Sequence, residues 1–487
     1  MSTVAEQPLP TGRRGPWAAM FAVCFTQAVV LLDTTAVNVA VPSVAHGLHA
    51  GMDQVLWMIN AYLLAYAVLL ATGGRLGDLF GPRRIFLIGL AVFVLASAAC
   101  GAAQTPEQAI IARVFQGVGG ALQTPQAMAI ITRMFPADRR GAALGVWGSF
   151  AGIVAAAGPT LGGLMVSWLG WRGIFYLNLP VGLIGSVLVV LLVPRLASAR
   201  RRRIDLLGSA VLTVGMLGVV YGLIEGPPHH WGALLGPLTT PVVIAAGVLL
   251  LGVFLLVERG RQERDPLVPF TILRNRNFTV MAVVVSVLPC GLGGVLLLTP
   301  LYLQEVQKFS AFRAGLLIAA APLVSIFVAP YSGKLCDRFG GKYVMVAGLL
   351  LFGTGIGLLA GLIRTQSGWA ALLPGLFFVG LGMGVAFAPA GVVAFARIPP
   401  EMSGAASGVF NTTRLCGSLL GSASVAALLQ AQLSHGGVTH AVRVTYLLPV
   451  AVLAAGALVT LLVRPDPVEE PAPPTVDEVS EPTGSRA

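Results

Sequence analysis

Charged side chains are scarce in this sequence. Asp, Glu, Lys and Arg make up 10% of its 487 residues, whereas soluble domains average roughly a quarter. Hydrophobic residues make up 56%, and the mean hydropathy is +0.84. A water-soluble fold of this size has too little interior to hide so much apolar surface, so the composition indicates a membrane protein.

The sequence also lacks the patterns that most enzymes and cofactor-binding proteins need. Its five cysteines are scattered without CxxC spacing, which argues against a disulfide framework or a cysteine metal site. No GxxxxGK[ST] run is present, so an ATP site of that kind is excluded. The segments between apolar runs are too short for a soluble catalytic domain. We therefore expect no metal, no cofactor and no enzymatic activity, with a membrane-embedded enzyme or receptor as the distant alternative.

About fourteen apolar runs divide the chain, and each is long enough to cross a bilayer as a helix. They lie near 17–42, 54–73, 85–103, 108–131, 143–167, 173–193, 207–226, 239–257, 278–303, 314–332, 343–363, 370–396, 404–430 and 442–463. The first run lacks a cleavage site followed by a mature domain, so it is predicted to be a span and not a signal peptide. The sequence thus predicts an all-α membrane protein with fourteen spans.

The positive charges predict the topology of these spans. With the N-terminus in the cytoplasm, 24 of the 31 Lys and Arg residues fall in cytoplasmic segments, five in outer loops and two, Arg113 and Arg414, inside spans. Positive charge is retained on the cytoplasmic side of a membrane. Both termini are therefore predicted to be cytoplasmic, and the net charge of +11 is explained without a nucleic-acid partner.

A charged, glycine-rich segment, 74–84, forms a hinge between the second and third runs. It recurs as 333–343, at a shift of 259 residues, with Gly, a base, Leu, Asp, Phe and Gly in the same relative places. Such a repeat indicates two related halves. We interpret both copies as a charged latch that stabilises one conformation and breaks in another, with a simple topogenic loop as the alternative. The latch residues are Gly74, Arg75, Gly77, Asp78, Gly81, Arg83 and Arg84 in the first copy and Gly333, Lys334, Asp337 and Arg338 in the second.

Two charged residues lie deep inside apolar runs of the first half. An ionised carboxylate in hydrocarbon is costly, so Asp33 should face a cavity and either pair or take up a proton. Arg113 also needs a partner, and Asp33 is the obvious one in this half. The two are predicted to carry proton coupling. A capping acid near the outer end of a helix, and an arginine that reaches the outer interface, are the alternatives.

Polar residues within the spans are candidates for a substrate cavity. Gln116 and Gln123 are seven residues apart and share nearly one helix face, and Asn411 and Arg414 share another. Arg414 either lines the cavity or reaches phosphate headgroups. Asn38 of the first run completes the predicted cavity set.

The fifth run combines small residues with a proline. Gly158, Pro159, Gly162 and Gly163 lie close together in it. Glycines at four-residue spacing allow helices to approach closely, and the proline permits a kink because it removes one backbone hydrogen bond.

Together these motifs resemble a known family. Segment 74–84 resembles the signature loop of the major facilitator superfamily, the stretch around Arg113 resembles the fourth-span motif of its drug exporters, and 158–163 resembles their antiporter motif. Segments 32–35 and 171–180 are similar to those of the fourteen-span drug:proton antiporter family. The resemblance covers about 10–465.

Two positions depart from the family's pattern. Gly173 stands where a bulky aromatic is expected, which should affect packing. Cys336 stands in the second latch copy where the first copy has Gly77.

The resemblance implies the major facilitator fold, with two six-helix bundles and two extra central transmembrane helices. The expected parts are a cytoplasmic tail 1–16, a bundle 17–193, a two-span insert 194–277 with basic flanking loops, a bundle 278–463 and a disordered cytoplasmic tail 464–487.

The resemblance also implies a proton-coupled antiporter that exports amphipathic drugs or antibiotics from the cytoplasm or inner leaflet across the cell membrane. A dedicated exporter of one endogenous metabolite is the main alternative. The expected partners are a small amphipathic substrate, protons and the lipid bilayer, and the protein is expected to act as a monomer.

Overall fold

The computed structural model describes residues 15–135, 137–196, 206–235, 238–262, 270–364, 368–395, 398 and 403–464. The tails predicted at 1–16 and 464–487 lie outside these residues except for 15, 16 and 464. The arginine cluster at 200–203 also lies outside them.

The first part of the chain forms six long helices. They are α1 (Pro16–Leu48), α2 (Met52–Phe80), α3 (Pro82–Ala102), α4 (Pro106–Met134), α5 (Ala137–Leu169) and α6 (Arg172–Leu192). The first span was predicted to end at Pro42, but α1 continues to Leu48. The prediction was wrong there because a transmembrane helix tolerates an internal proline when neighbouring helices surround it.

A helical hairpin follows, made of α7 (Leu206–Glu225) and α8 (Thr240–Gly260). Its connection contains two short antiparallel strands, β1 (Ala233–Leu235) and β2 (Leu238–Thr239). These strands were not predicted, because segments of two or three residues leave no periodic pattern in a sequence.

The rest of the chain is again helical. It contains α9 (Phe270–Leu273), α10 (Arg276–Glu305), α11 (Ala311–Ile318), α12 (Ala320–Phe339), α13 (Gly341–Leu362), the 3₁₀ turn η1 (Trp369–Leu372), α14 (Leu373–Phe395), α15 (Ser403–Leu433), α16 (Val438–Thr445) and α17 (Leu447–Thr460). Two predicted spans are interrupted, one at Ala319 between α11 and α12 and one at Tyr446 between α16 and α17.

Twelve helical segments among the described residues are long and apolar enough to cross a membrane. Helices α4, with 29 residues, and α5, with 33, are also long but are not among the twelve. Helix α4 is more polar than the others because it carries Arg113 and several glutamines. The protein is thus an all-helical, multi-pass membrane protein, and the predicted number of fourteen spans depends on α4 and α5.

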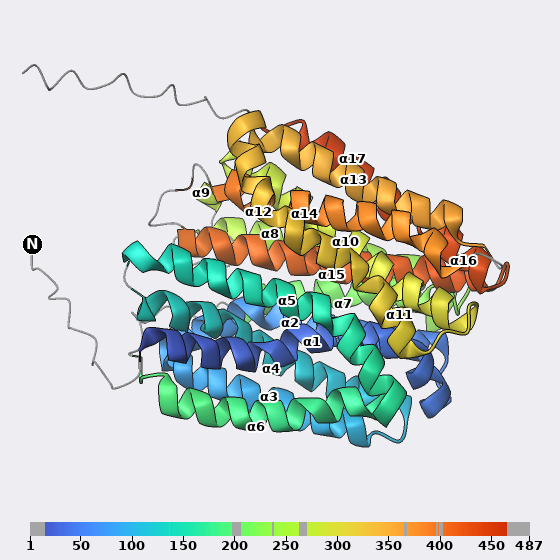
Figure 1. The fold of residues 1–487 in the computed structure, drawn as a ribbon, viewed down its shortest axis with the longest axis horizontal. Helices are drawn as coiled ribbons and strands as arrows, with labels where there is room; N and C mark the ends of the chain where they lie inside the picture. The colour runs from blue at the N-terminus through green and yellow to red at the C-terminus, as the bar shows by residue number, and fades with distance from the viewer. Residues whose placement is uncertain are drawn as a thin grey trace, which may run out of the picture.

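Helices α1 to α6 pack mainly on one another, and so do α10 and α12 to α17, whereas α11 packs mainly on α5 (Figure 1). The two groups meet where α5 packs on α11, α2 on α15 and α1 on α10. Helix α7 lies against both α2 and α15, so the α7–α8 hairpin sits beside the junction of the two groups.

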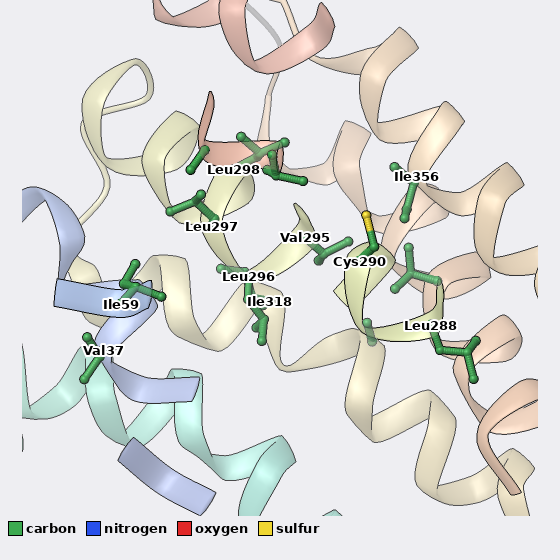
Figure 2. Packing of buried hydrophobic residues seen from close by; sticks show 14 of the residues in the cluster. Val37, Ile59, Leu288, Cys290, Val295, Leu296, Leu297, Leu298, Ile318 and Ile356 are labelled. Carbon is green, nitrogen blue, oxygen red and sulfur yellow. The ribbon is translucent and has the colours of Figure 1, made fainter. Parts of the chain in front are cut away.

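A large cluster of buried apolar side chains spans this junction. Figure 2 shows Val37 of α1 and Ile59 of α2 near Leu296 of α10 and Ile318 of α11. Because these side chains come from both groups of helices, the two groups are in direct apolar contact where α1 and α2 meet α10 and α11.

Candidate functional site

Asp33 of α1 and Arg113 of α4 form a buried ion pair. Each residue is 1% exposed, and Arg113 Nη1 donates to Asp33 Oδ2. Asp33 lies next to the midpoint of α1, and Arg113 is the eighth residue of the 29 in α4, so the pair lies inside the first helix group and away from the helix ends. A buried ion pair is stable only when the remaining hydrogen bonds of both groups are satisfied, and the neighbouring side chains do this.

Gln116 joins the ion pair to two further helices. Its Nε2 donates to Asp33 Oδ1 at 3.0 Å and to Ser97 Oγ of α3 at 3.3 Å, while its Oε1 accepts from Arg113 Nη1 at 2.8 Å. Ser97 Oγ also accepts from Asn178 Nδ2 of α6 at 2.9 Å. The network therefore holds α1, α3, α4 and α6 around one carboxylate.

Helix α2 encloses the other side of Arg113. Arg113 Nε donates to the carbonyl oxygen of Met58 at 3.1 Å, and the guanidinium lies 4.1 Å from the centroid of the Tyr62 ring. Such a cation–π contact contributes about 2 kcal/mol when the groups are desolvated. Arg113 is thus held by a carboxylate, an amide, a carbonyl and a ring.

A small cavity borders Asp33. It measures about 10 Å³ and is lined by residues of α1, α5 and α6, among them Gly162, Ile174 and Asn178. This volume is about enough for one water molecule. A water held there would border the carboxylate, as proton transfer to or from Asp33 requires.

The glycines of α5 permit the close approach of α1 beside the ion pair. Gly158 and Gly162 both face α1, and a Cβ atom at Gly158 would collide with the side chain of Thr35, two residues from Asp33. Gly163 faces α11 instead. Because of this arrangement, α5 contacts the ion-pair helix on one side and the second helix group on the other.

The contact between α5 and α11 depends on glycine from both sides. A Cβ atom at Gly315 would collide with the backbone of Pro159. Two hydrogen bonds cross the same contact, from Thr160 Oγ1 to the carbonyl of Gly315 at 3.3 Å and from the amide of Phe312 to Ser167 Oγ at 3.2 Å. The predicted antiporter motif therefore lies at the interface of the two helix groups.

The first latch segment is mostly helical, so the prediction of an eleven-residue hinge was wrong in its extent. Helix α2 continues to Phe80, α3 begins at Pro82, and Gly81 alone separates them. Gly81 has a φ of 89°, a conformation that favours glycine. The apolar runs stop earlier than the helix because the last turns of α2 carry charge.

The other latch glycines serve packing against α4. A Cβ atom at Gly74 would lie 3.6 Å from Pro125, and one at Gly77 would collide with the side chain of Gln126. Gln126 Nε2 in turn donates to the carbonyl of Gly73 at 2.7 Å. These glycines allow α2 and α4 to run side by side.

The latch charges tie the ends of the first helices together. Asp78 Oδ1 lies 3.1 Å from Arg133 Nη2 at the end of α4. Arg83 Nη2 donates at 2.7 Å to a carbonyl near the end of α6, where a cation also complements the helix dipole. Of the other two latch cations, Arg75 is half-buried and Arg84 is exposed.

The second latch copy has the same backbone form. Helix α12 runs to Phe339, and Gly340, with a φ of 81°, separates it from α13. The guanidinium of Arg338 is exposed and lies 5.3 Å from the Phe339 ring centroid. The remaining second-copy residues lie on α12 with side chains outside the described part of the structure: Gly333, Lys334 and Asp337.

The residues predicted to line a cavity are not brought together. Gln116 belongs to the ion-pair network, and Gln123 is fully buried, with its Nε2 donating to a carbonyl of α1 at 3.2 Å. Asn38 is half-buried and donates within its own helix at 2.9 Å. Asn411 and Arg414 are half-buried on α15, in the other helix group.

Three parts of the ion-pair site were missed by reasoning from the sequence. They are Ser97, Tyr62 and the carbonyl of Met58. Serine and tyrosine also occur in apolar spans without a functional role, and every residue has a carbonyl, so no sequence pattern marks these three groups. Asn178 was noted only as part of a motif, although an amide in the apolar helix α6 indicates a buried partner. Within the ranges described above, no group of three or more His, Cys, Asp or Glu residues could hold a metal ion.

A buried ion pair inside a multi-pass helical bundle marks a functional site, of the kind that carries protons or ions in membrane transporters. The family model described as Major Facilitator Superfamily matches residues 23–422, with a further match to 314–485. The chain therefore belongs to the major facilitator superfamily.

Curated relatives match most of the chain. It is 37% identical to an uncharacterised MFS-type transporter of Mycobacterium tuberculosis, covering 86% of this chain and 72% of the relative. It is 34% identical to the tetracenomycin C resistance and export protein of Streptomyces glaucescens, covering 88% and 78%. It is 33% identical to a multidrug resistance protein of Mycobacterium tuberculosis, covering 83% and 74%.

Among solved structures, an auto-inhibited peptide transporter of the POT family superposes with a TM-score of 0.67. The superposition covers 94% of this chain and 99% of that one at 13% identity. At this identity the similarity concerns the fold alone.

Proposed function

We propose that this protein is a secondary antiporter that exports amphipathic drugs or antibiotics from the cytoplasm or inner leaflet in exchange for protons. The observation that carries the proposal is the ion pair of Asp33 and Arg113, buried inside the first helix group and bonded to Gln116. An intramembrane carboxylate of this kind marks a proton or ion pathway in transporters. Relatives named for antibiotic resistance and export support the direction of transport.

The geometry offers a route from proton binding to conformational change. Protonation of Asp33 neutralises the carboxylate and weakens its attraction for Arg113. A resulting shift of α1 displaces α5, because Gly158 and Gly162 of α5 pack directly on α1. The displacement of α5 then reaches α11, because Gly163 of α5 packs on α11. Proton and substrate then favour opposite conformations of the two helix groups. Each proton that enters along a 100 mV potential supplies about 2.3 kcal/mol.

The proposed architecture counts α4 and α5 as spans, giving fourteen. The six-helix bundles are 17–193 and 278–463, and the two-span insert is 194–277. We place both termini in the cytoplasm and the protein in the cell membrane as a monomer. The pair of Asp78 and Arg133 and the second latch copy then lie at the cytoplasmic end, where they stabilise one of the two conformations.

Proton-coupled export is tested in inside-out vesicles whose pH gradient is reported by a quenched dye. A panel of lipophilic cations, neutral antibiotics and acidic amphiphiles is added to wild type, Asp33→Asn and the control Asp53→Asn, which alters a partly exposed acid in the first turn of α2. Wild type and control should dequench the dye, and Asp33→Asn should not, although it reaches the membrane. Full proton-coupled export by Asp33→Asn would disprove the assignment.

A dedicated exporter of a single compound is the second candidate. It is favoured by the relative named for tetracenomycin C resistance and export. The same panel separates the two, because dequenching by several unrelated compounds supports a multidrug exporter and dequenching by one compound class supports a dedicated one.

A further inference from the structure

Arg414 lies deep in the membrane-spanning part of the second helix group. It is the twelfth of 31 residues in α15, about 16 Å from the start of that helix at 1.5 Å per residue. The next residue, Leu415, packs in a cluster with Tyr62 and Tyr66 of α2. Tyr66 is the midpoint of α2, so this contact lies near the middle of the bundle and not at the level of the lipid headgroups.

No carboxylate neutralises Arg414 within the part of the chain that the structure describes. Among the described residues, the titratable group that acts electrostatically on Arg414 is the phenol of Tyr66, which packs in one cluster with the adjacent Leu415. The Tyr66 hydroxyl donates to Thr124 Oγ1 at 3.0 Å, and Gln27 Nε2 donates to the same oxygen at 2.7 Å. These groups are polar but uncharged, so the hydrogen-bonded network around Tyr66 brings no negative charge to Arg414.

The contrast with Arg113 shows that this charge is in excess. Asp33 neutralises Arg113, whereas no ion pair of Arg414 with an acid is present among the described residues. An uncompensated charge in a bilayer is costly and is kept where it faces a cavity or binds a ligand. Arg414 is only half-buried although it is far from both ends of α15, so part of the side chain is left uncovered by the protein and open to a ligand.

Two tyrosines connect Arg414 to the ion pair. Tyr62 lies over Arg113 at 4.1 Å, and the Tyr62 and Tyr66 ring centroids are 5.8 Å apart. The Tyr62 hydroxyl is buried and has no hydrogen-bond partner in the described structure. Between Arg113 and Arg414 lie two buried aromatic rings and one buried hydroxyl that has no partner among the described residues, beside the cation of Arg414.

We propose that Arg414 binds the acidic group of the exported molecule, so that the substrates are amphiphiles with a carboxylate or ionised phenol beside an apolar body. The inference deepens the proposed export function and rests on it. A guanidinium holds a planar oxyanion through paired, charge-assisted hydrogen bonds. The rings of Tyr62 and Tyr66 accept the apolar body, and an amine in the same place is repelled by the uncompensated charge.

The test measures binding, not export, with three fluorescent probes of one shape. They are anthracene-2-carboxylate, anthracene-2-carboxamide and 2-(aminomethyl)anthracene, titrated onto the full-length protein in phosphatidylcholine nanodiscs. The variants are Arg414→Gln, Arg414→Lys and, as a control, Arg313→Gln, which removes an exposed arginine of α11. Fluorescence anisotropy gives the dissociation constants.

Wild type and the control should bind the carboxylate about tenfold more tightly than the amide, as expected for a charge-assisted hydrogen bond. Arg414→Gln should lower this ratio to about one without changing the affinity for the amide. Arg414→Lys should keep part of the ratio, because it keeps the charge but loses the planar fork. A ratio of about one in wild type, an unchanged ratio in Arg414→Gln, or no binding of any probe by wild type would overturn the inference.

A lipid phosphate has the same anionic chemistry as an acidic substrate. The titration is therefore repeated in nanodiscs that contain phosphatidylglycerol. Unchanged carboxylate binding supports a substrate site, whereas competition that disappears in Arg414→Gln assigns Arg414 to a headgroup and overturns the inference. Because the export test depends on Asp33 and this one on Arg414, the two proposals fail separately: proton-coupled export of cations alone would leave the function standing and remove this inference.

Discussion

At the scale of single residues, the pair of Asp33 and Arg113 makes a prediction about stability. Removing one member of a buried pair leaves the other charge unpaired and costs about 3–5 kcal/mol. Arg113→Gln should therefore lower the thermal unfolding temperature of the purified protein sharply. The double variant Asp33→Asn/Arg113→Gln should recover much of the loss because both charges are gone. Additive losses in the double variant would show that the two residues do not act as a pair.

Ser97 allows a second residue-scale prediction. It accepts hydrogen bonds from Gln116 and Asn178 and donates to the carbonyl of Phe175 at 2.9 Å. Ser97→Ala removes the shared acceptor, which should cost about 1–3 kcal/mol and slow proton-coupled export because Gln116 positions Asp33. The control is Ser186→Ala, since among the described residues that hydroxyl bonds to a carbonyl of its own helix at 2.7 Å and to no other group. Equal effects of the two substitutions on unfolding and export would contradict the role of the network.

How far the sequence predicts the site depends on how rare each signal is. Asp33 and Arg113 could be paired in advance because they are the acid and the base that lie deep in the apolar runs of the first half. Ser97 and Tyr62 could not be found, because their roles come from the angles at which α2, α3 and α4 pack. Gln116 and Gln123 share a helix face, yet only Gln116 reaches Asp33.

At the scale of secondary-structure elements, the α5–α11 contact should control how the two helix groups close. Gly163→Ala and Gly315→Ala each place a methyl group against backbone of the opposite helix. Spin labels on the exposed positions Leu169 and Leu316 should report a longer and broader distance distribution in these variants. The control Gly252→Ala, at a glycine of α8 with open space around it, should leave the distribution unchanged and favour its helix by up to about 1 kcal/mol. An unchanged distribution in both interface variants would mean that the contact does not limit closure.

The ends of the helices were predicted less well than their existence. Apolar runs marked the spans, but α2 continues to Phe80 through the charged turns of segment 74–80, where α4 and solvent satisfy its side chains. Helix α4 shows the converse, since its glutamines lower its hydropathy while their hydrogen bonds hold neighbouring helices. Apolar character reports contact with lipid, whereas the length of a helix also depends on its protein neighbours.

At the scale of the whole molecule, hydrogen bonds join the α7–α8 hairpin to α2 of the first helix group. Trp57 Nε1 donates to Glu225 Oε1 at 2.8 Å, and the hydroxyls of Thr72 and Ser209 lie 2.9 Å apart, so hydrogen bonds tie both ends of α7 to α2. Among the described residues, the cluster that α7 shares with α15 is apolar and includes Leu419. Shear motion of packed helices would break the two hydrogen bonds if α7 slid along α2, but would not break them if α7 slid along α15. The hairpin should therefore travel with the first helix group.

Paired spin labels test this directly in a variant whose five cysteines have been replaced. Labels at Leu207 and Phe80 join α7 to α2, and labels at Leu207 and Gly408 join α7 to α15; all three positions are exposed. Between acidic and alkaline proteoliposomes, the first distance should stay constant and the second should shift by several ångströms, because only the second crosses the sliding surface. Adding Trp57→Phe, which removes one tie to α2, should broaden the first distribution. A constant second distance with a changing first one would place the hairpin with the other helix group, and α2 would then have to slide along α7 against its own hydrogen bonds.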